Sequence, residues 1–461
     1  MAREGAGSGG GPALTSASIA AGPGVDRYRQ QLEGLSRRHT EPAWLRERRA
    51  AAFERFAVRG FPTSKDEAWR QTSVARLAGT DFLRPEPSGA DDPPEDSSTP
   101  RSTGPTAAFV NGRYVAPISA RNEGPPGVEV LSLRRLLERS PERLEAYLAP
   151  GLDPSATAFA DLNTALHEDG AVVFLAPGAN VEDPIHLVFA STGEPDRATV
   201  SHPRVLIVAE RGSRARIVET YLGRSGTQYL TNAVSEVRVE AGAEIEHYRL
   251  QQESEAAFHV GRLAVQIQRE GRFTDRSFSF GATLARLDLD LALRGEGGEC
   301  TLEGLFFASG DRHAAVHTRV DHAAPRCTSR QLYKGVLDGG GRGVFHGLVL
   351  VRPGAQKTDA VQNNRNLLLS RDALVSSTPQ LEILADDVKC KHGSTTGQLD
   401  AEALFYLRSR GIGLAEARGL LTRAFAGELV RRIGEASVRA AVEAELGARL
   451  GGRPSTDEHA G

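Results

Sequence analysis

Two residues with metal-binding side chains stand close together near the C-terminal end of the chain, in the stretch "ADDVKCKHGSTTGQLD" (Ala385–Asp400). Cys390 and His392 are two residues apart, and thiolate and imidazole are both ligands for zinc and iron. The other cysteines, Cys300 and Cys327, are distant in sequence, and no CxxC motif exists. The pair therefore supplies at most half of a four-ligand metal site.

Strand geometry decides whether this pair can act together. If Leu381–His392 is one strand, Cys390 and His392 point to the same face, with Cα atoms about 6.6 Å apart. Lys389 and Lys391 then lie on the opposite, charged face. The alternative is that Cys390 is a small buried apolar residue and His392 is a hydrogen-bonded strand end.

A second group of candidate ligands lies upstream, in "DRHAAVHTRVDH" and after the next Gly-rich turn. His313, His317 and His346 could form a cupin-like metal site of a metalloenzyme, in which histidines line a barrel. His322 has the opposite strand parity to His313 and His317, and the cupin His-x-His pair is missing. Packing and hydrogen bonding are therefore favoured, and the metalloenzyme is kept as the alternative.

Bulk composition excludes several classes of protein. The 461 residues carry 56 Lys plus Arg against 59 Asp plus Glu, a formal net charge of -3. This balance gives no basic footprint for nucleic acid or an anionic membrane. Three widely spaced cysteines fit a reducing compartment, and neither a signal peptide nor an apolar run of about 18 residues is present. We expect a soluble, cytoplasmic protein.

Catalytic motifs are also missing from the sequence. It contains no GxxxxGK[ST] loop, no GxGxxG between strand and helix, no GxSxG elbow and no HExxH. The chain is therefore not expected to hydrolyse a nucleotide or to transfer an acyl group by itself. These absences favour a non-catalytic scaffold.

Periodicity and low-complexity stretches divide the chain into regions. Apolar residues recur every three or four positions near both ends, whereas short alternating runs fill the middle. Asn111-Gly112 between two short apolar runs predicts a hairpin. The expected regions are a disordered tail (1–25), a helical N-terminal domain (26–165) containing a disordered linker (84–106), a β-region (166–397), a helical C-terminal domain (398–450) and a second disordered tail (451–461).

The β-region shows a repeat of nearly constant length. Glycines at 212, 242, 271 and 298 are separated by 30, 29 and 27 residues, and no long helix interrupts about 220 residues. A strand-bearing repeat of this length predicts a solenoid of stacked β-coils. A β-sandwich or double jelly roll would show the same alternation and remains the alternative fold.

Amphipathic helices follow the β-region. Asp400 is a plausible helix N-cap, and Gly411 is expected to end that first helix. The helices could cap the solenoid or bind a partner in helix-in-groove fashion. The residues expected to contact a partner are Phe405, Leu421, Phe425 and Val430.

Several stretches together resemble one known family. Residues 311–425, including "ADDVKCKHGSTTGQLD" and "LFYLRSRGI", resemble the SufB/SufD family of iron–sulfur cluster assembly scaffolds, most closely SufD. "FPTSKDEAWRQTSV" (Phe61–Val74) resembles the N-terminal signature of SufD. The resemblance implies a right-handed parallel β-helix flanked by helical regions.

The resemblance also implies partners and a cargo. The expected assembly pairs the β-helix of this chain with that of a SufB paralogue and contains two copies of the ATPase SufC, one held by the C-terminal helices of each scaffold. His392 matches the SufD histidine at the SufB interface, where a transient iron–sulfur cluster forms before transfer to apoprotein acceptors, and Cys390 matches the neighbouring cysteine. The sulfur-accepting cysteine belongs to SufB, so Cys300 and Cys327 receive no such role. Lys391 and the long 84–106 insertion depart from the family pattern.

Overall fold

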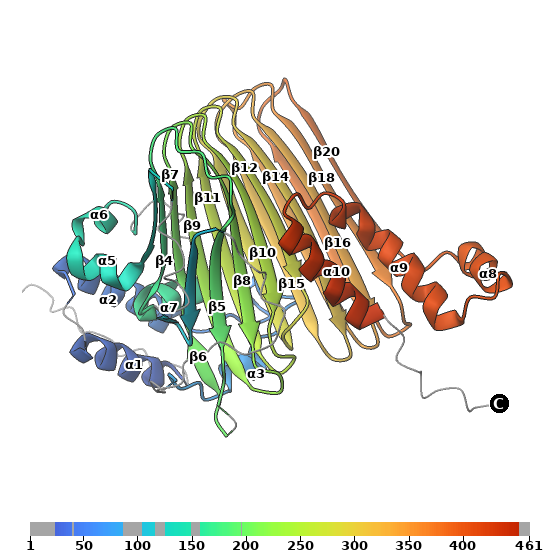
Figure 1. The fold of residues 1–461 in the computed structure, drawn as a ribbon, viewed down its shortest axis with the longest axis horizontal. Coiled ribbons are helices and arrows are strands. Elements are labelled where there is room, and N and C mark those ends of the chain that lie inside the picture. The colour runs from blue at the N-terminus through green and yellow to red at the C-terminus, as the bar shows by residue number, and fades with distance from the viewer. Residues whose placement is uncertain are drawn as a thin grey trace, which may run out of the picture.

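The fold is a parallel β-solenoid with helical regions attached near both ends (Figure 1). The computed structural model describes residues 24–38, 41–85, 104–115, 125–148, 157–194 and 196–450. The predicted tails, 1–25 and 451–461, and the predicted linker, 84–106, fall mostly or wholly outside these residues.

Successive strands of the solenoid alternate between two sheets. We name them the β20 sheet, with strand order β2-β1-β5-β8-β10-β12-β14-β16-β18-β20, and the β19 sheet, with order β19-β17-β15-β13-β11-β9-β7-β4-β3. From β7 onward each strand pairs in parallel with the strand one coil away, as β14 does with β16. This connectivity confirms the solenoid and excludes the sandwich. The strands are β4 (Gly170–Leu175), β5 (Ile185–Ser191), β6 (Thr199–Ser201), β7 (Arg204–Ala209), β8 (Arg214–Gly223), β9 (Tyr229–Val239), β10 (Glu244–Gln252), β11 (Phe258–Ile267), β12 (Arg272–Ser279), β13 (Leu284–Leu293), β14 (Glu299–Ser309), β15 (His313–His322), β16 (Thr328–Asp338), β17 (Arg342–Val351), β18 (Asp359–Leu368), β19 (Leu374–Ile383) and β20 (Lys389–Gly397).

A left-handed turn residue recurs once per coil and explains the glycine repeat. Gly212, Gly242, Glu270 and Gly297 have φ values of 68°, 67°, 56° and 72°. The amide of each donates to a carbonyl of the next turn, as Gly242 does to Arg269 at 2.9 Å. Two of the four predicted glycines, at 271 and 298, therefore lie one residue past the left-handed position. The repeat length agrees with the prediction, and in these two coils the glycine follows the left-handed residue instead of providing it.

The solenoid interior combines apolar rows with a buried charge cluster. His247 lies between two carboxylates, with Nδ1 at 2.7 Å from Asp275 and Nε2 at 3.2 Å from Glu219. Arg249 donates to the second oxygen of Glu219 at 3.1 Å, and all four side chains are almost fully buried. Such charges are tolerated in an interior because they are paired with one another.

The N-terminal region supplies strands as well as helices. Its helices are α1 (Val25–Arg38), α2 (Ala43–Arg59), the short 3-10 helix η1 (Glu67–Trp69), α3 (Ala75–Ala78), α5 (Leu133–Arg139), α6 (Glu142–Glu145) and α7 (Ala158–Leu166). β1 (Thr106–Val110) pairs in parallel with β5, and β3 (Val128–Ser132) pairs antiparallel with β4. β1 and β2 (Arg113–Tyr114) form the predicted hairpin, since Asn111 and Gly112 both have positive φ.

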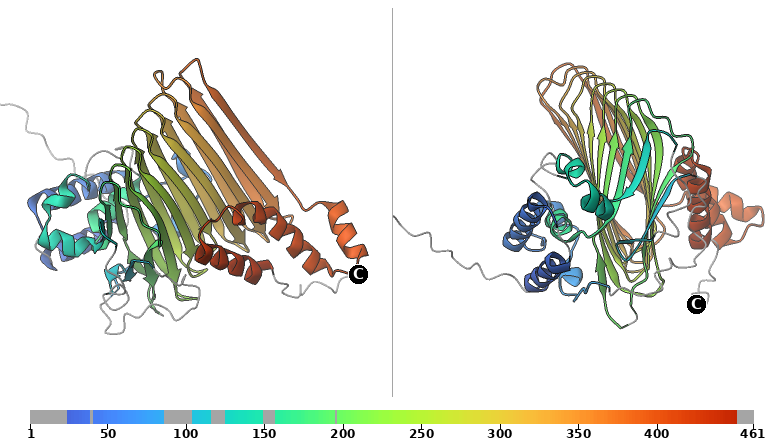
Figure 2. Two further views of the ribbon diagram at one scale, coloured as in Figure 1. Left: turned by 45° about the horizontal axis from the view of Figure 1, so that its top comes forward. Right: turned by 60° about the vertical axis from the view of Figure 1, so that its left-hand side comes forward.

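The C-terminal helices lie across the outer face of the β20 sheet, opposite the side that carries the N-terminal helices (Figure 2). They are α8 (Ala401–Ser409), α9 (Leu414–Val430) and α10 (Ala436–Leu450). Asp400 caps α8 as predicted, since its side chain accepts the amides of Glu402 and Ala403. α9 and α10 bury an apolar cluster against β8 to β16, whereas α8 has no buried residue and projects past the last coil (Figure 1).

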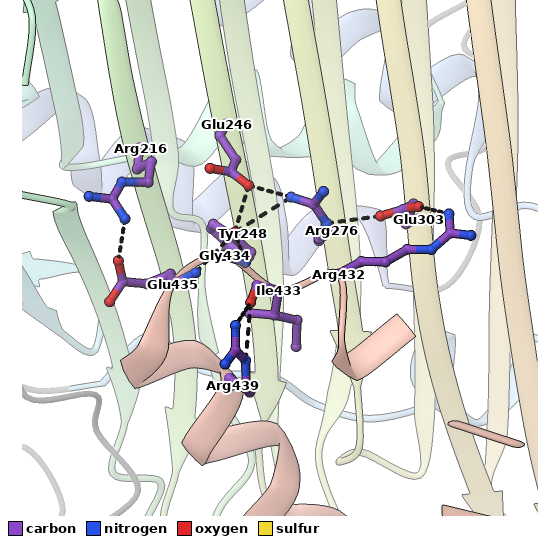
Figure 3. Close-up of polar contacts among 10 residues, drawn as sticks. All are labelled: Arg216, Glu246, Tyr248, Arg276, Glu303, Arg432, Ile433, Gly434, Glu435 and Arg439. Atoms are coloured by element: carbon purple, nitrogen blue, oxygen red, sulfur yellow. Dashed lines mark hydrogen bonds and ion pairs between the residues drawn. The ribbon is translucent and has the colours of Figure 1, made fainter. Parts of the chain in front are cut away.

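A row of alternating charges fixes the α9–α10 turn to the solenoid (Figure 3). Arg276 on β12 contacts Glu246 on β10 and donates to Glu303 on β14 at 2.9 Å. The second oxygen of Glu303 accepts from Arg432, just after α9. Because Glu303 is 5% exposed, these contacts form a partly buried charge ladder rather than loose surface pairs.

Tyr248 completes the same attachment (Figure 3). Its hydroxyl accepts the amides of Gly434 and Glu435 at 3.0 and 3.3 Å and donates to Glu246 at 2.6 Å. Glu435 also pairs with Arg216 at 3.0 Å. The turn between α9 and α10 is therefore a fixed part of the solenoid wall.

Candidate functional site

The solenoid ends in two full-length strand edges. β20 and β19 are the last strands of their sheets, and most residues of both are exposed or half-exposed. The expectation of a single strand over Leu381–His392 is wrong, because β19 ends at Ile383 and a turn precedes Lys389. At this end Leu374 and Leu384 are 56% and 54% exposed.

Cys390 lies on the inner side of β20. Its register partner on β18 is Ala360, which is fully buried. Cys390 packs against the apolar cluster that joins Ala360 to Val349 on the opposite sheet, so its side chain points between the two sheets. Burial raises the pKa of the Cys390 thiol above its usual range.

His392 shares this inner face because it lies two residues further along β20. Its register partner is Gln362, which is 0% exposed. Gln362 reaches across to the β19 sheet, since a Cβ on Gly347 would come within 2.3 Å of its Nε2 atom. His392 itself is exposed only because β20 is the last strand of its sheet. The common face of Cys390 and His392 agrees with the parity argument.

Polar side chains surround this inner face, which we call the mouth of the solenoid. Ser394 on β20 contacts Ser377 on β19 at 2.7 Å, and Ser377 donates to Asn364 at 2.7 Å. The side-chain amide of Gln362 has no hydrogen-bond partner among the described residues. A hydrophilic mouth with one thiol and one imidazole can therefore offer two ligands to a metal ion and hydrogen bonds to a polar cargo.

The upstream histidines do not form a metal site. His317 and His346 are register partners whose rings stack at 5.3 Å, and His313 lies 3.2 Å from the hydroxyl of Thr72. Burial lowers the pKa of all three imidazoles, and nearby Arg286 contributes to this shift. Across the described part of the chain no group of three or more His, Cys, Asp or Glu is placed to hold a metal ion. The cupin-like alternative is therefore not supported.

These histidines instead lie on the outer face of the β19 sheet, next to the N-terminal segment 61–74. Arg286 stacks over the Trp69 ring at 3.6 Å and donates to the carbonyl of Ala68 at 2.7 Å. His322, with the opposite parity, points inward and contacts Ser329 at 2.9 Å. Packing and hydrogen bonding, the favoured interpretation from the sequence, account for these residues.

The two remaining cysteines are buried. Cys300 and Cys327 are 2% and 0% exposed. Burial, with a smaller contribution from Cys327, raises the pKa of the Cys300 thiol to about 12, and burial also raises the pKa of Cys327. Neither thiol is an accessible nucleophile at neutral pH.

The four residues expected to bind a partner have different environments. Phe405 is 75% exposed on α8, and Leu421 is half-buried on α9. The Phe425 ring lies 4.6 Å from Lys334 Nζ, and Val430 is 7% exposed within the apolar cluster on the solenoid. Val430 therefore faces its own chain, which corrects that part of the prediction. Exposed residues that the prediction did not include are Tyr406, Leu414 and Leu420.

Comparison with known proteins identifies the family. Residues 189–425 match the family model described as SUF system FeS cluster assembly, SufBD core domain, and residues 25–187 match the SufBD protein N-terminal region. The chain belongs to the SufBD family of iron–sulfur cluster assembly proteins.

Similar proteins span nearly the whole chain. An iron–sulfur cluster assembly SufBD family protein of Synechocystis sp. is 33% identical over 87% of this chain and 90% of its own length. Iron–sulfur cluster assembly protein SufD of Escherichia coli is 30% identical over 85% and 90%. SufD of Bacillus subtilis is 25% identical over 88% and 93%. Among the described helices, none is long and apolar enough to cross a membrane.

Proposed function

We propose that this chain is a SufD-like, non-catalytic scaffold subunit of a SUF complex. Its open end pairs with a SufB paralogue, and its projecting helices bind the ATPase SufC. The iron–sulfur cluster is cargo: it forms transiently at the junction of the two scaffolds and passes to apoprotein acceptors. Cys390 and His392 are this chain's contribution to that junction.

The single observation that carries this proposal is the open end of the solenoid. β19 and β20 present 10 and 9 residues of strand edge, and no further strand of the described chain pairs with their outward amides and carbonyls. Such an edge favours addition of a strand from another chain. A chain added there would lie directly against the mouth. It could then supply the remaining ligands to a metal ion bound by Cys390 and His392.

The ligand chemistry supports a shared site. Neutral imidazole and thiolate both bind iron, and iron–sulfur clusters need more ligands than these two residues supply. Because burial raises the pKa of Cys390, its thiol keeps its proton at neutral pH until a metal ion displaces it. We therefore expect Cys390 and His392 to bind iron or a cluster only when a partner chain adds further ligands and covers the mouth.

The surface of this chain that we assign to SufC binding includes fewer of the C-terminal helical residues than the sequence predicted. α8 and the first half of α9 carry exposed Phe405, Tyr406, Leu414 and Leu420, whereas the second half of α9 packs on the solenoid. Large exposed aromatic and aliphatic side chains are typical of the centre of a protein interface. We assign SufC binding to this arm, residues 401–421.

Affinity purification of the full tagged chain from its native cell, read by mass spectrometry, tests the proposal. We expect a SufB paralogue and an ABC-type ATPase to co-purify. A deletion of residues 401–413 should lose the ATPase and keep the paralogue, because α9 and α10 stay attached. Recovery of neither protein, or undiminished ATPase recovery by the deletion variant, would contradict the assignment.

A further inference from the structure

A pocket enclosing about 410 Å³, its opening included, lies near the first coils, at the opposite end from the mouth. It is bordered by α1, the β1–β2 turn, the end of α7 and the segment after β6. Its interior space is only about 30 Å³, so it suits a ligand of a few atoms rather than a drug-sized molecule. Its polar lining consists mainly of hydrogen-bond donors, and this imbalance calls for an explanation.

Two guanidinium groups in the pocket share one carboxylate. Arg38 Nη2 lies 3.4 Å from Glu168 Oε1, and Arg84 Nη2 pairs with Glu168 Oε2. A third guanidinium group, that of Arg113, has its Nε atom 3.9 Å from Glu168 Oε2. One Arg84 nitrogen, Nη1, is buried without a partner among the described residues. Among the described residues that line the pocket, two guanidinium groups therefore face a single carboxylate.

The neighbouring acidic residue does not restore the balance. The carboxylate of Asp169 accepts the Ser132 hydroxyl at 2.9 Å and the amides of Arg134 and Gly170 at 3.0 and 2.8 Å. Asp169 therefore serves the N-terminus of α5 and does not line the pocket.

A buried imidazole adds a donor with no acceptor. His202 is 8% exposed and lines the pocket. Its Nδ1 atom lies 3.1 Å from the amide nitrogen of Asn232, which also donates to the carbonyl of Phe159. Nδ1 must therefore accept, so the ring proton sits on Nε2, which has no partner within the described structure. An unpaired buried donor is costly.

We propose that this pocket binds a phosphoryl group, as free phosphate or as a phosphate monoester. A tetrahedral oxyanion presents several acceptors at once, so it can take the Nε2 proton of His202 and the free guanidinium edges of Arg38 and Arg84 together. Arginine forks suit phosphate geometry, and the anion offsets the excess charge around Glu168. A water molecule would satisfy His202 but would leave the charge unbalanced. This inference is independent of the proposed scaffold role.

Titration calorimetry of the full chain with inorganic phosphate, at constant ionic strength, tests the site. We expect saturable binding of one phosphate, with a Kd of about 1 mM or tighter. Arg38→Ala should weaken binding at least tenfold, whereas Arg37→Ala should not. Arg37 is the matched control because it is the adjacent residue of α1, is 81% exposed and pairs with Glu33 instead. Tighter binding of glycerol 3-phosphate than of phosphate would identify a monoester ligand.

A second variant separates the site from general charge effects. His202→Phe keeps a ring of similar size but removes the Nε2 proton, and it should also weaken phosphate binding about tenfold without a change in net charge at neutral pH. Circular dichroism confirms that each variant is folded. Absence of saturable binding to the wild type, or equal weakening by Arg38→Ala and Arg37→Ala, would overturn the proposal.

Discussion

The two ends of the solenoid are finished in different ways. At the first end the sheets finish in short antiparallel strands, β2 with 2 residues and β3 with 5. Aromatic rings fill the space between them: Phe109 stacks on Phe189 at 5.0 Å and meets Tyr114 edge to face at 5.7 Å. At the last end the strands keep their full length, and the interior opens onto polar residues and His392.

This difference distinguishes an end that is capped from an end that is left open. A solenoid needs a cap at each end, and short or covered edges prevent unwanted strand pairing. Within the described ranges, such a cap is present at the first end and not at the last. Its C-terminal helices, which could have covered the last coil, instead lie across the outer wall of the β20 sheet and project α8 past the end (Figure 1). We infer that a second chain completes the last end.

Blocking the open edge should have the largest effect. Lys389 donates its amide to the carbonyl of Thr358, just before β18, so alternate residues, including Thr396, direct their amides away from the sheet. Thr396→Pro removes one outward donor and should weaken paralogue binding about 100-fold. Thr396→Ala is the control and should bind normally. Normal pull-down of the paralogue by Thr396→Pro would show that the edge is not the interface.

Changing the projecting arm should affect only the ATPase. Phe405→Asp places a charge in the expected apolar contact and should weaken ATPase binding about 30-fold, as loss of a central interface aromatic does. Glu402→Lys, on the same helix, changes a solvated residue and should have little effect. Surface plasmon resonance with both partners provides the measurement. Equal loss of paralogue binding would argue that the two surfaces are not separate.

Breaking the charge ladder should release α9 and α10 from the wall. Glu303→Gln removes the charge that Arg276 and Arg432 share, and we expect a loss of about 2 kcal/mol in the free energy of local opening. Hydrogen exchange of residues 431–435 measures it. Glu299→Gln, an exposed position on the same strand, is the control. Unchanged exchange in Glu303→Gln would assign the attachment to apolar packing alone.

The buried cluster of His247, Glu219 and Asp275 should make the unfolding free energy depend on pH. Burial alone would lower the pKa of His247, but the carboxylates of Glu219 and Asp275 outweigh it and raise the pKa to about 9. The stabilisation is complete below the unfolded pKa of about 6.5 and is lost as pH rises through 9. Unfolding free energy should fall by up to about 1.4 kcal/mol per pH unit in this window. His247→Gln should abolish the slope, and an unchanged slope would contradict this origin.

The sequence predicted the parts of the fold that depend on local rules. Coil length, the hairpin at Asn111-Gly112 and the Asp400 cap follow from turn and capping preferences, and the structure contains each. The position of the left-handed residue could not be read from the glycines alone, because Glu270 adopts this conformation and the glycine of that turn, Gly271, follows it. The prediction that the side chains of Cys390 and His392 point to the same face also agrees with the structure, because side chains alternate regularly along β20.

Long-range packing explains what could not be predicted. Val430 has the helical spacing of a partner-binding stripe, yet it packs on β-strands about 100 residues or more upstream in the sequence. The mouth residues Gln362, Asn364 and Ser377 lie one coil or one sheet away from His392, with no local motif to signal them. An exact alignment of the successive coils would have identified these residues as neighbours of His392, because residues at the same position in adjacent coils lie side by side in the interior.

The most direct test of the account is cluster formation by an assembled complex that carries His392→Ala. His392 is exposed at the mouth and has no side-chain hydrogen bond or ion pair to the described part of the chain, so the melting temperature and partner binding should be unchanged. Iron and sulfide content of the purified complex should fall at least tenfold, with a smaller loss for Cys390→Ala and none for Lys391→Ala on the outer face. A normal cluster yield from a fully assembled His392→Ala complex would contradict the claim that this end supplies half of a shared site.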